Sequence, residues 1–222
     1  MMTRTALVTG ASRGIGFAIA NKLRESGIKT LTPARHELNL LSDASVDKYI
    51  RKLTNPIDIL INNAGINPLA GITEITDSDI EDTFKVNFIS PLRLIRDLMP
   101  SMIKRRFGRI VNISSIWGNV SKAKRSAYAA SKSAINSLTR TVAVEVAKYN
   151  ILVNALAPGF VNTELTRQNN TETEIKKISM SIPMGRLAEP FEIAEVVAFL
   201  SSEKNSYITG QTIIIDGGYT CL

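Results

Sequence analysis

Short apolar strands alternate with helical segments along almost the whole chain. The strand candidates are residues 4–9, 29–34, 57–62, 109–114, 151–157 and 211–216. Strands that alternate with helices form a parallel sheet with helices on both faces. The pattern therefore predicts a doubly wound, three-layer α/β/α fold. With 222 residues, 44% of them hydrophobic, the chain is expected to form a single domain over residues 1–222.

The first predicted strand passes into a helix over residues 15–26 through a glycine-rich turn. A turn with few side chains lets backbone N–H groups approach a pyrophosphate at the positive end of the helix. No Gly-Lys-Ser/Thr follows, so a P-loop is not predicted. A purely structural glycine turn is the alternative. The candidate cofactor-binding residues here are Gly10, Ser12, Arg13, Gly14, Ile15 and Gly16.

Tyr128 and Lys132 lie four residues apart in a predicted helix, and Tyr128 follows Ser115 by thirteen residues. Residues four apart share a helix face, so the lysine ammonium can lie beside the phenol and lower its pKa from about 10. Tyr128 is then a candidate proton donor and acceptor. Ser115 can hydrogen-bond a substrate carbonyl as charge develops on its oxygen. The combination predicts nicotinamide-dependent carbonyl chemistry.

Composition excludes several other classes of protein. The net charge is +7, but the basic residues are spread along the chain without a nucleic-acid reader motif, so an anionic cofactor or carrier is the expected partner. Cys221 is the only cysteine and His36 the only histidine, so neither an internal disulfide nor a metal site is expected. With no apolar stretch of about 20 residues and no signal-peptide profile, we expect a soluble, cytoplasmic protein without a membrane span.

Two further helices and a mobile segment are predicted from local signals. Ser42 is a good N-cap for a helix that ends at Leu53, and Asp77 or Ser78 begins a long helix that ends near Arg106. Pro91 is expected to bend that long helix. Residues 162–185 are polar and lack a strong period, and they emerge where ligands bind in doubly wound sheets. We expect them to form a mobile lid over the substrate.

Together these motifs resemble the short-chain dehydrogenase/reductase family over nearly the whole chain. The resemblance implies a Rossmann-type fold and an NAD(P)-dependent oxidoreductase with the catalytic residues Asn87, Ser115, Tyr128 and Lys132. Asn87 would hold a helix distortion and a water that links Lys132 to solvent, and Lys132 would also hold the nicotinamide ribose. The further motifs that carry the resemblance are Asn62-Asn63-Ala64-Gly65, Pro158-Gly159, Thr209-Gly210-Gln211 and Asp216-Gly217-Gly218.

The resemblance also implies which residues contact the cofactor. Asn63, Ala64 and Gly65 would line its adenine side, and Asn39 and Leu40 would bracket the adenine ring. The nicotinamide half would meet Pro158, Gly159, Val161 and Thr163. Where NAD-dependent relatives carry an acidic residue for the ribose, this chain has Ala34 and Arg35. Because Arg13 and Arg35 together suit a 2′-phosphate, NADPH is the expected cofactor and NADH the alternative.

One departure from the family pattern follows the second strand. Only three residues separate Ala34 from Leu38, whereas neighbouring parallel strands need a crossover of about a dozen residues. The helix before the third strand is therefore predicted to be missing. Six strands remain, in the order 2-1-4-5-6-7 when the family's strand names are kept. Residues 38–40 would reach the adenine as a loop or a short edge piece.

Within the family, the chain is most similar to the 3-oxoacyl-(acyl-carrier-protein) reductases, through residues 104–112 and 158–161. The expected function is therefore NADPH-dependent reduction of a 3-oxoacyl thioester to its 3-hydroxyacyl form, in fatty acid biosynthesis, with Tyr128 as general acid. An acidic carrier protein would dock on a basic patch near the site entrance. Arg106 matches one docking arginine, and Lys148 lies beside Tyr149 at the second position. The alternative for residues 104–106 is the basic end of a helix.

Two other functions stay open at this point. The first is a dehydrogenase or reductase of a small free alcohol, ketone or sugar, and the second is a non-catalytic cofactor-binding scaffold. The four intact catalytic residues argue against the scaffold. By the resemblance, the chain would form a homotetramer or homodimer through its two long helices, at about residues 78–106 and 127–149, and again through its last helix and strand.

Overall fold

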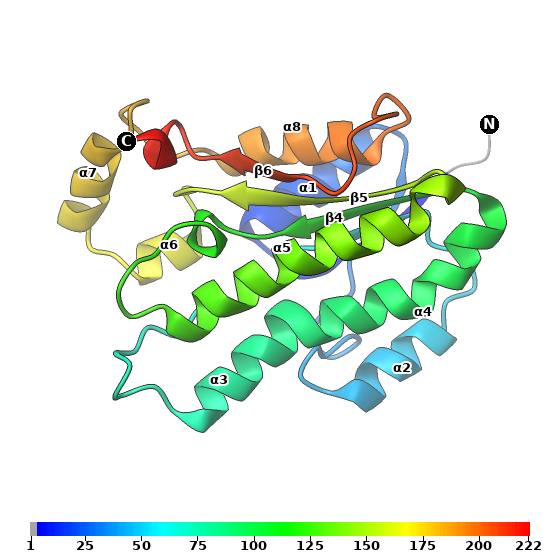
Figure 1. Ribbon diagram of the computed structural model, residues 1–222, viewed down its shortest axis with the longest axis horizontal. Coiled ribbons are helices and arrows are strands. Elements are labelled where there is room, and N and C mark those ends of the chain that lie inside the picture. The colour runs from blue at the N-terminus through cyan, green and yellow to red at the C-terminus, as the bar shows by residue number, and fades with distance from the viewer. Residues whose placement is uncertain (1–3) are drawn as a thin grey trace.

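The computed structural model describes residues 4–222 as a six-stranded, all-parallel sheet with helices on both faces (Figure 1). The order β2-β1-β3-β4-β5-β6 confirms the predicted fold class and the predicted topology. The central strands are buried along their whole length, as expected for a sheet covered on both faces. The strands are β1 (Thr5–Val8), β2 (Lys29–Leu31), β3 (Ile59–Asn62), β4 (Gly108–Ile113), β5 (Ile151–Pro158) and β6 (Thr212–Ile215).

Two helical layers enclose the sheet (Figure 1). Helices α1 (Gly14–Glu25) and α8 (Pro190–Ser201) cover one face, and α2 (Asp43–Arg51), α4 (Ser90–Arg105) and α5 (Ser126–Val146) cover the other. Successive strand residues point to opposite layers: Ala6 and Val8 pack with α1 and α8, whereas Leu7 packs with the other three helices. In Figure 1 the carboxyl ends of the strands point left, away from the N-terminus.

The segment after β2 confirms the predicted departure from the family pattern. The second strand ends at Leu31, three residues earlier than expected, and no further strand precedes α2 in the described chain. A turn at residues 35–37 and a loop follow instead. Ser42 caps α2 as predicted, since its hydroxyl accepts a hydrogen bond from Ser45 N at 3.3 Å. The helix ends at Arg51, two residues before the predicted Leu53.

The predicted long helix is not one regular helix. It consists of α3 (Asp77–Phe84), a π-helical segment (Lys85–Ile89) and α4. Its N-cap is Thr76, whose hydroxyl accepts a bond from Asp79 N at 3.1 Å, so the prediction of Asp77 or Ser78 as the opening residue is correct within a residue. The distortion lies in the π-helical segment. Pro91 follows directly as the second residue of α4, so the distortion begins before the proline.

Residues 162–185 contain two short helices that the sequence pattern did not predict. These are α6 (Glu164–Gln168) and α7 (Glu172–Ser181), and threonines cap both of them. No residue of either helix is buried. Without a buried face the apolar positions need no helical period, which explains why the pattern was weak. Both helices lie beyond the carboxyl ends of the strands (Figure 1), and their motion as a lid stays a prediction.

Among residues 4–222, no helix combines the length and the apolar character that a membrane crossing requires.

Candidate active site

A cleft of about 800 Å³ lies at the carboxyl ends of the strands. It brings together residues from the glycine turn, from the loop after β2, from the ends of β3, β4 and β5, and from the start of α5. Every predicted cofactor-binding residue lines it, as do three of the four predicted catalytic residues. These residues are Gly10, Ser12, Arg13, Gly14, Ile15, Gly16, Arg35, Asn39, Leu40, Asn63, Ala64, Gly65, Ser115, Tyr128, Lys132, Pro158, Gly159, Val161 and Thr163.

The glycine turn leaves no room for side chains. A Cβ on Gly16 would lie 2.3 Å from Asn63 Nδ2, and one on Gly10 would lie 2.8 Å from Ala64 Cα. Gly10 also has a φ of +64°, which favours glycine. The N-cap of α1, Arg13, makes no side-chain capping bond, and the first helical turn holds no acidic residue. The open N–H groups at the start of α1 therefore fit the pyrophosphate of a dinucleotide.

The end of β3 is held against this turn by one hydroxyl. Thr9 Oγ1 accepts hydrogen bonds from Asn63 N at 3.0 Å and from Ala64 N at 3.1 Å. In return, Asn63 Nδ2 donates to the carbonyl oxygens of Thr9 and Gly10. Asn63 therefore lines the cleft and also ties the end of β3 to the glycine turn by hydrogen bonds, and these bonds keep the two walls of the cleft close together.

The sequence predicts that Arg13 and Arg35 together bind a 2′-phosphate at the adenine end, but in the structure Arg13 has another partner. Arg13 Nη1 forms an ion pair with Glu164 Oε2 of α6 at 2.6 Å, across the cleft. Arg35 is exposed and has no ion pair among residues 4–222. The carboxylate of Glu37 accepts a bond from Ala34 N at 2.8 Å, close to where a ribose would lie in a dinucleotide fold. Asn39 directs its Oδ1 toward Leu41 N, at 3.1 Å, within its own loop.

Ser115, Tyr128 and Lys132 converge where β4 ends and α5 begins. Ser115 follows β4 and accepts a bond from Trp117 N at 3.3 Å, which starts a short 3₁₀ turn (Ile116–Gly118). Lys132 is buried and donates from Nζ to Ile113 O at 2.7 Å. Its Nζ also lies 5.5 Å from the centroid of the Tyr128 ring. The predicted sharing of one helix face is therefore correct.

Asn87 lies behind the cleft rather than in its wall. It stands in the π-helical segment and holds both backbone groups of Ile66, accepting from Ile66 N at 2.9 Å and donating to Ile66 O at 3.0 Å. It also donates to Ser131 Oγ at 3.0 Å, a contact that sequence reasoning missed. A Cβ on Gly65 would lie 3.4 Å from Asn87 Oδ1 and 3.6 Å from Lys132 Nζ, so both polar atoms approach the same small residue.

The pKa of Tyr128 moves against the expectation from sequence. Burial raises the pKa of its phenol, and the Ser115 hydroxyl and the Arg125 guanidinium oppose that rise without cancelling it. The predicted lowering by Lys132 is wrong for this state, because the lysine ammonium is turned toward Ile113 O. Burial also lowers the pKa of Lys132 to about 8. The phenol is therefore protonated at neutral pH, which suits a proton donor.

Trp117, Phe160 and Arg125 line the far end of the cleft, Tyr219 and Lys122 pack against these rings, and sequence reasoning selected none of the five. The rings of Trp117, Phe160 and Tyr219 meet edge to face, with centroids 5.3–6.2 Å apart. Lys122 Nζ and Arg125 Cζ each lie 5.7 Å from the Trp117 ring. Arg125 immediately precedes α5 and lies three residues before Tyr128, and this spacing is the only local signal that could have identified any of them.

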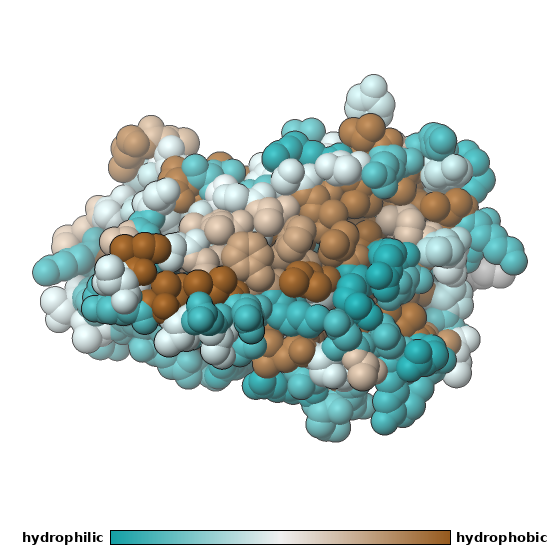
Figure 2. Space-filling view, turned by 60° about the horizontal axis from the view of Figure 1, so that its bottom comes forward, coloured by the Kyte–Doolittle hydropathy of each residue, from teal (hydrophilic) through white to brown (hydrophobic). Residues whose placement is uncertain are grey.

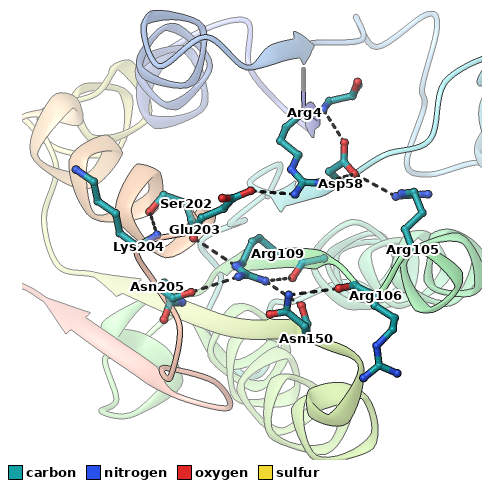
Figure 3. Close-up of polar contacts among 12 residues, drawn as sticks. Arg4, Asp58, Arg105, Arg106, Arg109, Asn150, Ser202, Glu203, Lys204 and Asn205 are labelled. Atoms are coloured by element: carbon teal, nitrogen blue, oxygen red, sulfur yellow. Dashed lines mark hydrogen bonds and ion pairs between the residues drawn. The ribbon is translucent and has the colours of Figure 1, made fainter. Parts of the chain in front are cut away.

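The expected docking patch lies far from the cleft of its own chain. Arg106 lies two residues before β4, at the amino ends of the strands, whereas Ser115 follows the carboxyl end of β4. Its Nη2 donates to Lys148 O at 3.0 Å. The neighbouring Arg105 pairs with Asp58 (Figure 3). Within one chain, the expectation of a basic patch near the site entrance is therefore wrong. The patch lies at the amino end of β4, whereas the site lies at the carboxyl end of the same strand.

Comparison with known proteins identifies the family. A family model described as enoyl-(acyl carrier protein) reductase matches residues 33–220. The 3-oxoacyl-(acyl-carrier-protein) reductase of Vibrio cholerae is 36% identical over 236 residues, covering 97% of this chain and 96% of the relative.

Solved structures agree with this assignment. A 4-hydroxyisoleucine dehydrogenase mutant complexed with NADH and succinate aligns with a TM-score of 0.94 and 27% identity, covering 99% of both chains. A gluconate 5-dehydrogenase of Burkholderia cenocepacia, in complex with NADP and tartrate, aligns with a TM-score of 0.91 and 28% identity over 99% of this chain and 96% of its own. With its fold, its cleft and its full-length relatives, the chain belongs to the short-chain dehydrogenase/reductase family and is an NAD(P)-dependent oxidoreductase acting on CH–OH groups.

Proposed function

We propose that the chain catalyses the NADPH-dependent reduction of a 3-oxoacyl group to the 3-hydroxyacyl form. The observation that carries this proposal is the convergence of Ser115, Tyr128 and Lys132 beside the glycine turn in one cleft. A protonated phenol and a buried ammonium at the end of β4 suit proton donation to a carbonyl oxygen.

The catalytic roles follow from the positions of the side chains. A bound NADPH supplies the hydride that the carbonyl carbon accepts. Ser115 and Tyr128 hold the carbonyl oxygen by hydrogen bonds, and Tyr128 donates its proton to that oxygen as negative charge develops. Lys132 is a cation below a pH of about 8 and stabilises the phenolate left behind. Asn87 keeps Ile66 and Ser131 in place around Lys132, so that the ammonium can be supplied with protons from solvent.

The choice of NADPH rests on the residues after β2. Arg35 is exposed at the adenine end, and the nearby carboxylate of Glu37 is already bonded to Ala34 N. Arg13 lies in the glycine turn and would exchange its exposed partner Glu164 for a 2′-phosphate. The relative from Burkholderia cenocepacia was solved with NADP, and the 4-hydroxyisoleucine dehydrogenase with NADH. The preference is therefore best tested by measuring kcat/KM with each cofactor.

Two forms of the substrate are compatible with this reaction. The full-length similarity to the reductase of Vibrio cholerae supports a thioester on an acidic carrier protein. Docking at Arg106 and Lys148 would then require a second copy of the chain, since this patch is remote from the cleft of its own chain. The second candidate is a small free ketone, alcohol or sugar acid, and the buried cation Arg125 at the substrate end of the cleft favours it.

Assembly into a homodimer or homotetramer is part of the same proposal. Figure 2 turns forward the side of the molecule with α3, α4 and α5, and apolar side chains gather along its middle. Among the exposed apolar residues of these helices, Val144 is 84% exposed on α5 and Leu92 is 36% exposed on α4. Apolar surface of this kind on two long helices is typical of an interface between copies. Analytical ultracentrifugation of the purified chain tests it.

The deciding experiment is the rate of NADPH oxidation by the purified chain with a panel of carbonyl compounds, run beside NADH. The panel holds a 3-oxoacyl thioester on carrier protein, the same acyl group as a free acid, and neutral ketones and sugars. Fast turnover of the thioester with NADPH supports the first candidate. Turnover of free compounds alone supports the second, and the absence of any turnover despite NADPH binding overturns the proposed function.

A further inference from the structure

A buried arginine without a counter-charge lies at the substrate end of the cleft. Arg125 is only 8% exposed, and its Nε is buried without a hydrogen-bond partner. Its guanidinium forms no ion pair and no side-chain hydrogen bond with any residue in the part of the chain that the structure describes, from 4 to 222. The same side chain lines the cleft. It is therefore a charged group that the protein itself leaves unsatisfied.

Such a group is unfavourable unless a ligand completes it. Burying a charge costs free energy unless a partner of opposite charge or several hydrogen bonds compensate. The face of Trp117 compensates in part, because Arg125 Cζ lies 5.7 Å from its centroid. Lys122 shares the same ring at 5.7 Å and also lies 5.5 Å from the Phe160 ring. Two like charges over one ring repel each other, and an anion near them would remove that repulsion.

The residues around this pair supply no anion for Arg125. Glu174 of α7 acts on Lys122, where its charge raises the lysine pKa against the lowering by burial and by Arg125. The pKa of Arg125 itself is lowered by burial, and the only group that raises it is Tyr128. Arg125 and Tyr128 are three residues apart in the chain, and both line the same cleft. An anion bound by Arg125 would therefore share that cleft with a carbonyl group held by Tyr128.

We propose that Arg125 binds an oxyanion of the substrate, so that the enzyme acts on small oxo acids whose carboxylate lies near the reacting carbonyl. This inference rests on the proposed function and specifies the substrate class of the same cleft. The reaction is unchanged: the carbonyl carbon gains a hydride and the oxygen gains the proton of Tyr128. Arg125 takes no part in bond making, and its guanidinium selects and orients the acid by charge-assisted hydrogen bonds.

The test compares the rates of reduction of an oxo acid and of its uncharged ester. Acetoacetate is the acid and methyl acetoacetate is the ester. A third probe, dihydroxyacetone phosphate, carries a phosphate in place of the carboxylate. We expect the native chain to have a kcat/KM for acetoacetate that exceeds that for the ester by at least about tenfold. Arg125→Met, which keeps the apolar stem over Trp117, should remove that preference by raising KM for the acid much more than KM for the ester.

Two further variants make the result specific. Arg125→Lys keeps the positive charge and should retain part of the preference for the acid. Arg51→Met makes the same substitution at an exposed residue that ends α2, and it should change nothing. Binding is also measured without turnover, since Trp117 is the only tryptophan of the chain and its fluorescence should respond to acetoacetate in the native protein but not in Arg125→Met.

The outcomes separate this inference from the function on which it rests. If acid and ester are reduced equally well and Arg125→Met alters both rates alike or neither, the oxyanion site is wrong while the reductase function stands. A preference for dihydroxyacetone phosphate over both other probes retains the oxyanion site and overturns the carboxylate. If NADPH is bound but no carbonyl compound is reduced, and the Trp117 fluorescence still reports acid binding that Arg125→Met abolishes, the proposed reaction fails and the site remains.

Discussion

Two buried arginines at opposite edges of the same sheet have very different surroundings. Arg109, at the amino ends of the strands, is 3% exposed and donates to the carbonyl oxygens of Gly108, Asn150, Ser202 and Asn205 at 2.9–3.4 Å (Figure 3). Arg125, at the carboxyl ends, is 8% exposed and makes no such bond within the described chain. Both lie over an aromatic ring, Phe107 or Trp117.

The difference separates a structural cation from a ligand-binding one. At the amino edge, the main chain supplies four acceptors for Arg109, and Asp58 and Glu203 pair with the neighbouring Arg4. At the carboxyl edge, Arg125 and Lys132 are buried without a carboxylate partner among the described residues. Substitutions at the first edge should therefore lower stability, whereas substitutions at the second should lower activity.

The largest effect is expected for Tyr128→Phe. Loss of one hydroxyl removes the proton donor, so kcat should fall by about 10²–10⁴-fold while NADPH still binds. Steady-state NADPH oxidation and a fluorescence titration with NADPH measure the two properties. A variant that keeps its rate would remove Tyr128 from the mechanism, and a variant that also loses NADPH binding would place the defect in the cleft as a whole.

Arg109→Met tests whether the arginine at the amino ends of the strands stabilises the fold. The substitution leaves buried carbonyl oxygens without their donor, and the free energy of unfolding should fall by about 2–4 kcal/mol. Urea denaturation measures this loss, and kcat per folded molecule should stay near the native value. Unchanged stability would show that the four hydrogen bonds of Arg109, three of them long-range, contribute little.

The pH profile of kcat/KM tests the role of Lys132, the second buried cation at the carboxyl ends of the strands. Burial lowers the pKa of Lys132 to about 8, so its charge is present below that pH and is lost above it. The kcat/KM for reduction should be level at neutral pH and fall by about tenfold for each unit above a pH of about 8. Initial rates between pH 6 and 10 measure it, with cofactor held at saturation. A profile that is level beyond pH 9 contradicts the assigned role.

The smallest effect is expected for Arg125→Met, which makes the same substitution at the carboxyl ends of the strands. Because Arg125 has no partner to lose, Arg125→Met should change the free energy of unfolding by less than about 1 kcal/mol, or raise it. Urea denaturation beside Arg109→Met measures the difference directly. A loss as large as that of Arg109→Met would mean that the chain itself satisfies Arg125, and the contrast between the two edges would disappear.

Much of the architecture could be predicted because it depends on local patterns. The alternation of strands and helices, the crossover too short for a third strand, and the Ser42 cap each depend on a few neighbouring residues, and the structure agrees with all three. The helices α6 and α7 were missed, because they bury no face and so leave no apolar period. The family resemblance predicted the helix distortion at Asn87, and the structure confirms it as a π-helical segment, whereas the local pattern could not predict it because such a bulge has no periodic signature.

The sequence by itself determined that the glycine turn, Ser115, Tyr128 and Lys132 share one cleft, because motifs that end parallel strands must meet at one edge of the sheet. Tertiary structure alone decided the pKa shifts of these groups and their ion pairs. Burial, and not the neighbouring lysine, sets the direction of the Tyr128 pKa, and Glu164 reaches Arg13 from a helix 151 residues away. Solvent exposure and charge pairing depend on contacts between distant segments. The unpaired charge of Arg125 became visible only once those segments were assembled.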